Sequence, residues 1–175
     1  MPRFTRTPAN WFLADNATVC GDVTVGEDSS VWFSAVVRGD VAPIRLGRRV
    51  NVQDGAIVHC DSGEPNEIGD DVTIGHRAIV HGASVGAGSL IGMGAILLGG
   101  TRIGRECLIA AGAVVPPGLV VPDRTMVVGV PGRLGRPLAE KDLTYMRWLA
   151  AHYVVLAGRY ATSDDVRPDG TRLPS

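Results

Sequence analysis

An aliphatic residue returns every six residues along most of the chain, and this period constrains the fold more than any other feature. A hexapeptide period is the signature of a parallel β-helix, in which each aliphatic side chain points inward and stacks on its counterpart in the next coil. Of the 17 steps in the series, 14 are six residues long, which a merely Val-rich β protein would not sustain. The series consists of Leu13, Val19, Val25, Val31, Val37, Leu46, Val52, Val58, Ile68, Ile74, Val80, Val85, Ile91, Leu97, Ile103, Ile109, Val115 and Val121.

Glycine follows many of these aliphatic residues. We expect it there because the chain turns a corner after each short strand, where a Cβ atom would obstruct the backbone. Three hexapeptides then make one triangular coil. The resemblance of this pattern to the hexapeptide-repeat proteins implies two further properties: a left-handed β-helix, against the usual right-handed preference of parallel crossovers, and a homotrimer. The glycines are Gly26, Gly47, Gly69, Gly75, Gly86, Gly92 and Gly104.

Three steps depart from the period. The step from Val37 to Leu46 is nine residues long, that from Val58 to Ile68 is ten, and that from Val80 to Val85 is five. We expect the first two to be loops that bulge from corners of the β-helix. Loops on a rigid scaffold are where functional residues tend to lie.

The hexapeptide period is absent from the C-terminal region. Apolar residues there recur at steps of three or four, which predicts an amphipathic α-helix packed along the outside of the β-helix. The predicted fold is therefore all-β: a left-handed parallel β-helix over residues 1–132, a connector and C-terminal α-helix over 133–161, and a polar tail over 162–175. The helical apolar residues are Leu143, Met146, Leu149, Tyr153, Leu156 and Tyr160.

Charge and cysteine usage exclude several classes of protein. The formal net charge is −1, so there is no electrostatic case for a nucleic-acid or membrane partner. Cys20, Cys60 and Cys107 are odd in number and far apart, which argues against a disulfide framework and a thiolate zinc site. No leader-like apolar region begins the sequence, and no apolar run approaches the roughly 18 residues of a membrane span. We expect a soluble, cytoplasmic protein.

Three of the four histidines lie within 23 residues: His59, His76 and His81. His59 and His81 each follow a valine, and those valines are three steps, or one coil, apart. The two imidazoles should therefore point outward from one face of adjacent coils, roughly 4.8 Å apart. His76 should point from another face, away from the pair, and would reach the pair of a neighbouring subunit in a trimer. Three histidines with an open fourth position form a catalytic zinc site; the alternative is a set of surface or interface histidines.

Polar residues one coil earlier surround this predicted site. Arg38 precedes His59 by one coil, with Asp40 beside it, and Asp54 occupies the column of His76, with Gln53 alongside. A neutral amide such as that of Gln53 can hydrogen-bond a metal-bound water or an oxyanion. An ion pair of Arg38 with Asp40 or Asp54 would be structural, and such a pair can also orient the ligands.

At these residues the sequence resembles the gamma-class carbonic anhydrase family. The resemblance is carried by "VVRGDVAPIRLGRRVNVQDGAIVH" and "VTIGHRAIVHGASVGAGSLIGMGAILLGG", and continues through "AAGAVVPPG" and "GVPGRLGRPL" to about Tyr160. It implies that His59, His76 and His81 bind Zn²⁺, with His76 supplied by the adjacent subunit; Fe²⁺ or Co²⁺ would also suit three histidines.

The same resemblance implies the activity and the surrounding roles. The activity is reversible hydration of CO2 to bicarbonate by a zinc-bound hydroxide. Asn51 and Gln53 would lie around the metal-bound water, Arg38 and Asp54 would form an ion pair near the interface, and Tyr153 would lie close to the site.

The sequence departs from the family's archetype at the proton-transfer step. The archetype carries a long acidic loop with a glutamate shuttle, whereas this chain has the short segment "CDSGEPNEIGDDVTIG". Glu64 and Glu67 in it do not align with the shuttle, and Val41 stands where the archetype has glutamate. The rate therefore stays open, and so do three alternatives: a metal-dependent acyl-CoA thioesterase, a hexapeptide acyltransferase and a catalytically weak trimeric scaffold. An acyltransferase needs a free histidine as general base, and only His152 is left uncommitted.

Overall fold

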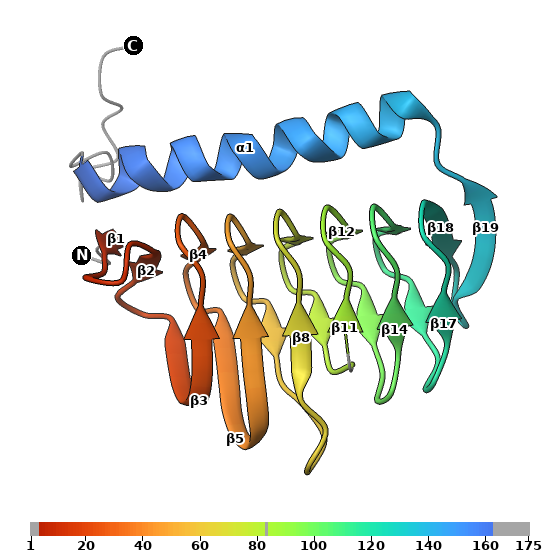
Figure 1. Ribbon diagram of the computed structural model, residues 1–175, viewed down its shortest axis with the longest axis horizontal. Helices are drawn as coiled ribbons and strands as arrows, with labels where there is room; N and C mark the ends of the chain where they lie inside the picture. Colours follow the sequence, from red (N-terminus) through yellow and green to blue (C-terminus); the bar gives the residue numbers. More distant parts are fainter. Residues whose placement is uncertain (1–3, 83, 163–175) are drawn as a thin grey trace.

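The computed structural model describes residues 4–82 and 84–162. These residues form a stack of parallel β coils with one long helix lying beside it (Figure 1). The fold class predicted from the hexapeptide period, a parallel β-helix with a C-terminal α-helix alongside, is confirmed. The predicted tail from residue 163 onward lies outside the described residues.

Most strands are only two residues long, as a six-residue repeat with a corner in each unit requires. They are β1 (Phe4–Arg6), β2 (Phe12–Ala14), β3 (Thr18–Val25), β4 (Ser30–Val31), β5 (Val36–Leu46), β6 (Asn51–Val52), β7 (Ile57–Val58), β8 (Asn66–Ile68), β9 (Thr73–Ile74), β10 (Ile79–Val80), β11 (Ser84–Val85), β12 (Leu90–Ile91), β13 (Ile96–Leu97), β14 (Arg102–Ile103), β15 (Leu108–Ile109), β16 (Val114–Val115), β17 (Val120–Val121), β18 (Thr125–Val128) and β19 (Arg133–Pro137).

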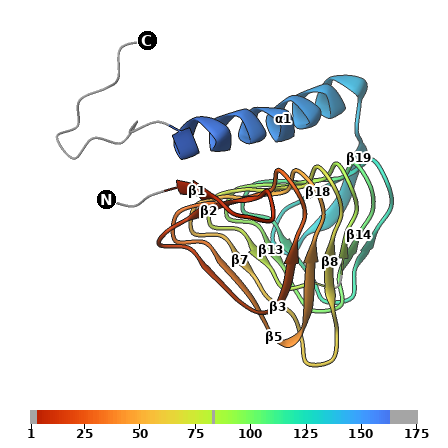
Figure 2. The ribbon, with the colours of Figure 1, turned by 60° about the vertical axis from the view of Figure 1, so that its left-hand side comes forward.

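The coils are triangular, and Figure 2 shows this outline. The first face contains β2, β4, β6, β9, β12, β15 and β18, with β1 and β19 added antiparallel at its two ends. The second face contains the first halves of β3 and β5, then β7, β10, β13 and β16, and the third contains their second halves, then β8, β11, β14 and β17. We call the bend after the first face the first corner, that after the second face the second corner, and that after the third face the third corner.

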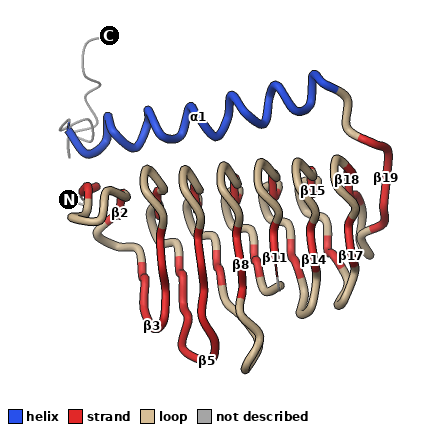
Figure 3. Tube along the Cα trace, in the orientation of Figure 1, coloured by secondary structure: helices blue, strands red, loops and turns tan. Residues whose placement is uncertain are grey.

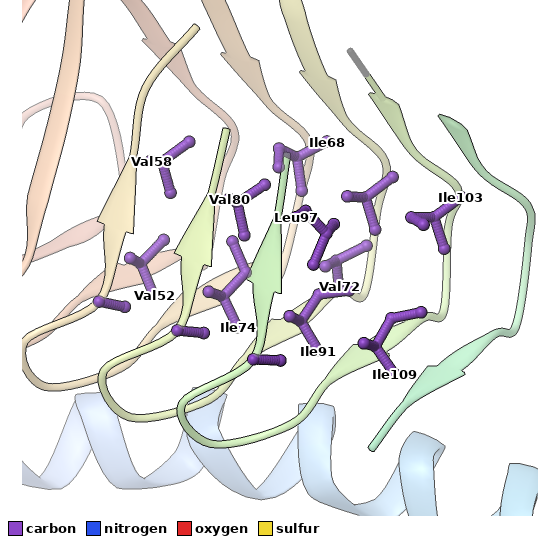
Figure 4. Close-up of a cluster of buried hydrophobic side chains, with 14 of the residues drawn as sticks. Val52, Val58, Ile68, Val72, Ile74, Val80, Ile91, Leu97, Ile103 and Ile109 are labelled. Atoms are coloured by element: carbon purple, nitrogen blue, oxygen red, sulfur yellow. The ribbon is translucent and has the colours of Figure 1, made fainter. Parts of the chain in front are cut away.

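The interior is a column of stacked aliphatic side chains (Figure 4). Val58, Val80 and Leu97 occupy the same register position on successive second-face strands, and each is fully buried. Ile74 and Ile91 do the same on the first face. Each aliphatic residue of the period thus fills the space above and below its counterpart, which is why the period holds the coils in register.

The glycines after the strands have a different role from the one predicted. A Cβ atom on Gly86 would lie 2.5 Å from the carbonyl carbon of Gly104, so glycine is required because adjacent coils approach closely. The turn itself is made two residues later, in the left-handed region, by Gly88 (φ +72°), Asp71 (φ +58°) or Arg77 (φ +57°) in different coils. Cβ would indeed obstruct the glycine positions, but the obstacle is the neighbouring coil.

One of the two predicted loops is wrong. The segment from Val37 to Leu46 is not a loop but part of the continuous strand β5, which crosses the second corner and pairs in parallel with β3. The two long strands extend the corner, as Figure 3 shows. The pairing of Gly21 with Gly39 allows this close approach, because a Cβ on Gly21 would lie 2.3 Å from the carbonyl oxygen of Gly39. The second predicted loop, between β7 and β8, is confirmed.

Helix α1 (Glu140–Thr162) runs the length of the first face. Leu143 and Met146 are buried against outward side chains of the first-face strands β12, β15 and β18. Near its C-terminus, Ala157 is buried in an aromatic cluster with Phe4, Phe12 and Trp32. The first face is therefore covered. No helix in the described ranges combines the length and apolarity needed to cross a membrane.

Candidate metal centre

His59 and His81 meet at the second corner. The parallel register of β7 and β10 sets Val58 beside Val80, so the histidine after each valine occupies equivalent places on adjacent coils. Nδ1 of His59 lies 3.2 Å from Nε2 of His81. The buried amide of Asn66 donates to the carbonyl oxygens of His59 (2.9 Å) and Val80 (3.2 Å), which fastens the backbone at both histidines. Two ring nitrogens in this arrangement can share a proton or bind one metal ion.

Each of the three candidate histidines has a carboxylate near its other ring nitrogen, within hydrogen-bond distance for His59 and His76. Oδ1 of Asp40 lies 3.0 Å from Nε2 of His59, and Oδ2 of Asp61 lies 3.7 Å from Nδ1 of His81. At the first corner, Oδ2 of Asp54 lies 2.9 Å from Nδ1 of His76. A carboxylate on the second nitrogen fixes the tautomer and orientation of a metal-ligating imidazole.

Asp61 is a site residue that the sequence analysis missed. A Cβ on Gly99 would lie 2.3 Å from Oδ2 of Asp61, so the carboxylate occupies space that only glycine leaves at that position. The signal in the sequence is slight: Asp61 follows His59 by two residues, in a loop without the hexapeptide period. Its contact with His81, from the next coil, depends on the path of that loop.

Arg38 and Asp40 belong to the second-corner group. Within one chain, Arg38 forms an ion pair with Asp40; the predicted pair of Arg38 with Asp54 near the subunit interface stays a prediction. Hydrogen bonding to His59, and then to Arg38, lowers the pKa of Asp40 below its ordinary value. Asp40 is thus an ionised carboxylate at neutral pH, held between a guanidinium and an imidazole.

His76 has its own set of polar neighbours at the first corner. Oε1 of Gln53 accepts a hydrogen bond from the His76 backbone N–H (3.2 Å), and Nε2 of Gln53 donates to Oδ1 of Asn51 (2.9 Å). Asn51 in turn donates to Thr73 Oγ1 (2.9 Å), and both amide side chains are buried. This chain of bonds holds the Gln53 amide in one orientation and leaves one of its two N–H donors for another partner.

The hydroxyl of Tyr153, on α1, lies 3.4 Å from Nε2 of His76. Burial, followed by the nearby charge of Asp54, raises the pKa of Tyr153, so the phenol stays protonated at neutral pH. Docking of α1 on the first face therefore brings a hydrogen-bond donor to the first-corner group.

The candidate residues of one chain thus form two groups at different corners. One holds His59, His81, Arg38, Asp40 and Asp61; the other holds His76, Asn51, Gln53, Asp54 and Tyr153. Across the described part of the chain, no group of three or more His, Cys, Asp or Glu side chains is arranged to hold a metal ion. Glu64 and Glu67 line a separate hollow of about 420 Å³ with Arg102 of the third face.

Comparison with known proteins bears on the family of the chain and on its fold. Residues 82–117 match the model of the bacterial transferase hexapeptide (six repeats) family. A carbonic anhydrase of Geobacillus kaustophilus is 45% identical over 146 residues, which cover 83% of this chain and 80% of that protein. The mitochondrial gamma carbonic anhydrase 2 of Arabidopsis thaliana is 37% identical over 159 residues, 87% of this chain and 57% of that protein.

The similarity is also seen in the three-dimensional structure of a known protein. A Bacillus cereus protein described as an acetyltransferase superposes with a TM-score of 0.85 and 40% identity, over 90% of this chain and 91% of that one. Proteins similar to this chain are thus named for two activities, carbonic anhydrase and acetyltransferase. The identity to the carbonic anhydrases extends over most of the chain. On these grounds the chain belongs to the gamma carbonic anhydrase family.

Proposed function

We propose that the protein is a metalloenzyme that hydrates CO2 reversibly to bicarbonate, at a site shared by two subunits of a homotrimer. The observation that carries the proposal is the pair formed by His59 and His81, whose ring nitrogens face each other at 3.2 Å while each opposite nitrogen has its own carboxylate. The relatives named as carbonic anhydrases support the reaction.

The donor set fits a divalent metal. Neutral imidazoles suit Zn²⁺, and also Fe²⁺ or Co²⁺. Two histidines do not complete a site of the catalytic kind, which takes three protein ligands and keeps a fourth position open. His76, with Nδ1 held by Asp54 and Nε2 in contact only with the Tyr153 hydroxyl at 3.4 Å, is suited to be the third ligand. Zinc, when bound, supplies a water whose pKa is lowered toward about 7.

An apolar stripe on the second face supports the homotrimer. Outward side chains of the third face are mostly polar, and the first face is covered by α1, but on the second face the outward residues from β5 to β16 are aliphatic. Ile57 is 38% exposed, and the others of the stripe are half-buried in one chain. A stripe of this kind marks an interaction surface. It consists of Val36, Ile57, Ile79, Ile96 and Val114.

The stripe also lies between the two groups of site residues. The second face begins at the first corner, which holds His76, and ends at the second corner, which holds His59 and His81. If a second copy of the chain binds to this face, each of the two chains contributes one of its groups of site residues at the border of the interface. That placement favours assembly of His76 from one subunit with the pair from its neighbour.

The remaining residues take roles that follow from their contacts. Asp40, Asp61 and Asp54 orient the three imidazoles. The free N–H of Gln53 and the hydroxyl of Tyr153 are donors beside His76, suited to hold the developing bicarbonate anion. Glu64 and Glu67 face the third-face hollow, so protons leave to solvent or buffer without them.

Metal content and CO2 hydration test the proposal together. We would measure metal per subunit in protein purified without a histidine tag, and follow CO2 hydration by stopped flow with and without added zinc. The test variant is His59→Ala, and the control is His152→Ala on the exposed side of α1. About one metal per subunit, with metal and hydration lost only in His59→Ala, is the expected result. Absence of metal from the wild type would contradict the proposal and leave a scaffold.

A second candidate function is metal-dependent hydrolysis of a thioester. It rests on a groove of about 340 Å³ between α1 and the first face, whose lining includes His76, Gln53 and Tyr153. Such a volume exceeds what CO2 needs and is in the range of small-molecule pockets. The acetyltransferase description of the Bacillus cereus structure is compatible with an acyl substrate. The walls of the groove are largely apolar and include Leu90, Leu108, Met93, Tyr145 and Leu149.

A groove-filling variant separates the two candidates. Leu149→Trp should leave CO2 hydration near the wild-type rate because CO2 needs little of the groove. The same variant should abolish hydrolysis of acyl-CoA thioesters if the groove receives the acyl chain. Failure of the wild type to hydrolyse a panel of short and long acyl-CoA thioesters would remove this candidate.

A further inference from the structure

A cavity of about 580 Å³ lies at the third corner, between the corner turns and helix α1. The third corner is the one that holds neither group of candidate histidines. Four arginines and two carboxylates line the cavity, which gives the lining a formal charge of +2. The arginines are Arg49, Arg105, Arg124 and Arg147, and the carboxylates belong to Asp71 and Glu106.

Glycine and alanine open this cavity in a column of long side chains. The left-handed residues of successive third corners are Arg49, Asp71, Gly88, Glu106 and Arg124. At Gly88, a Cβ would lie 3.3 Å from Cγ of Glu106, and the preceding residue is Ala87. The coil in the middle of the column therefore contributes no long side chain, and the space is left between charged neighbours.

Ion pairs hold three of the arginines in place without using all of their donors. Nε and Nη2 of Arg49 bond Asp71 (2.6 and 2.7 Å), which leaves Nη1. Nε of Arg124 bonds Glu106 (2.7 Å), which leaves both of its Nη atoms. Arg147 bridges Glu106 (3.2 Å) and Glu140 (2.9 Å) and so ties the helix to the corner.

Arg105 is the arginine with the most donors left. Its backbone N–H bonds Asp123, but its exposed side chain makes no ion pair or side-chain hydrogen bond with the described residues. On the helix side, Met146 and Ala151 provide an apolar wall. The cavity thus combines unused guanidinium donors with an apolar surface of small extent.

We propose that this cavity binds a phosphorylated small molecule carrying at least two phosphate-type charges. Guanidinium groups recognise phosphate oxygens through paired N–H donors, and the three fixed arginines are already ordered, which reduces the entropic cost of binding. Arg105 closes on the anion, and Met146 and Ala151 contact the organic part. Since the apolar stripe of the second face lies away from the third corner, the cavity stays open when a second copy covers that stripe.

Binding of inorganic pyrophosphate tests the proposal on the full chain. Titration calorimetry at fixed ionic strength should show saturable binding, weakened at least tenfold in Arg105→Gln. The matched control is Arg102→Gln, an exposed arginine on β14 outside the cavity, which should bind as the wild type does. Equal weakening in both variants would overturn the proposal, because it would mean that only the net charge matters.

A second variant separates this cavity from the histidines, since phosphate anions also bind metals. His59→Ala should bind pyrophosphate as tightly as the wild type. Loss of binding in His59→Ala would place the anion on the metal centre and overturn the proposal. Arg147→Gln gives an independent check: it should also weaken binding, and unchanged affinity in both Arg105→Gln and Arg147→Gln would show that pyrophosphate binds elsewhere.

Discussion

At the scale of single residues, each candidate ligand is one half of a histidine–aspartate pair. Asp40, Asp54 and Asp61 reach their histidines from three different segments: strand β5, the first corner and the loop after β7. Such pairs are expected at metal sites, because a carboxylate raises the basicity of the imidazole and fixes its ring. The pairing is therefore the residue-level feature that separates a metal site from a chance gathering of histidines.

We predict that Asp61→Asn weakens metal binding by about tenfold, in the range for loss of a residue that orients a metal ligand. Asparagine keeps the size of the side chain but not its charge, so the fold should be unchanged. Competition with a chelator gives the affinity. Glu64→Gln, in the same loop and facing the third-face hollow, is the control. Equal affinities in wild type and Asp61→Asn would show that Asp61 does not orient His81.

We predict opposite effects from alanine at two glycines. Gly86→Ala should destabilise the protein by about 1–3 kcal/mol, because Cβ meets backbone atoms of the next coil. Gly158→Ala, inside α1 with nothing within 4 Å of the added Cβ, should stabilise it by up to about 1 kcal/mol. Urea unfolding curves measure both. A neutral Gly86→Ala would mean that the coils can separate at little cost.

At the scale of elements, α1 links the β-helix to the candidate site. The helix starts where Asp142 returns to accept a hydrogen bond from the backbone N–H of Ala139 (2.8 Å), while Arg136 bonds both carboxylate oxygens (2.6 and 3.0 Å). Its middle covers the first face, and Tyr153 reaches His76. Any loss of helix docking therefore also removes a donor from the first-corner group.

The pH dependence of α1 follows from Asp142. The Arg136 hydrogen bonds, and then that from Ala139, lower the pKa of Asp142 from 3.8 to about 2. Because the folded carboxylate binds its proton more weakly than the unfolded one, its stabilising contribution is complete above about pH 4 and is lost as the pH falls toward 2.

We predict that wild type exceeds Asp142→Asn in urea midpoint at pH 5 and that the difference shrinks at pH 3 and below. Other carboxylates titrate in both proteins, so the difference isolates this group. A difference that stays constant from pH 5 to pH 2.5 would contradict the assignment.

Sequence reasoning was most successful where the period was strict. The stacking of Val58 on Val80 follows from counting coils, and with it the placement of His59 beside His81. It failed between Val37 and Leu46, because a broken period says only that extra residues are present. Whether they form a loop or a longer strand depends on the pairing of β5 with β3, which involves residues 18 or more positions away.

The hexapeptide period gives no account of contacts made across elements, and only the family resemblance placed Tyr153 near the site. The contact of Tyr153 with His76 joins residues 77 positions apart and depends on how α1 docks. The aromatic cluster of Phe4, Phe12 and Trp32 beneath the helix end has no period at all. Asp61 and Asn66 were missed for the same reason, since Asp61 lies in the irregular segment after β7 and Asn66 begins β8 directly after that segment.

At the scale of the whole molecule, the three faces have three different environments. One is covered by α1, one is mostly polar, and one carries the apolar stripe from Val36 to Val114. Since the stripe borders both groups of site residues, the proposed assembly and the proposed metal site stand on the same surface. A substitution that disrupts the proposed assembly should therefore also disrupt the proposed metal site.

We predict that Ile79→Asp, in the middle of the stripe, converts the proposed homotrimer to a monomer and abolishes the proposed metal binding. One aspartate per subunit is enough, because a single buried and unpaired charge at a protein interface already costs several kcal/mol. Light scattering gives the mass, and metal analysis the occupancy. Ser84→Asp, at the corresponding outward position of the third face, should change neither. A trimeric Ile79→Asp with metal bound would place the interface elsewhere.

The two antiparallel strands at the ends of the first face bear on solubility. A stack of identical coils presents unpaired backbone at both ends, and two such molecules could join end to end into a fibre. Here β1 folds back on β2 at one end and β19 on β18 at the other, so the first-face sheet ends in strands that run against its direction. Pro137, at the end of β19, has no backbone N–H to pair with a further strand. The number of coils in the molecule is therefore limited by its own sequence.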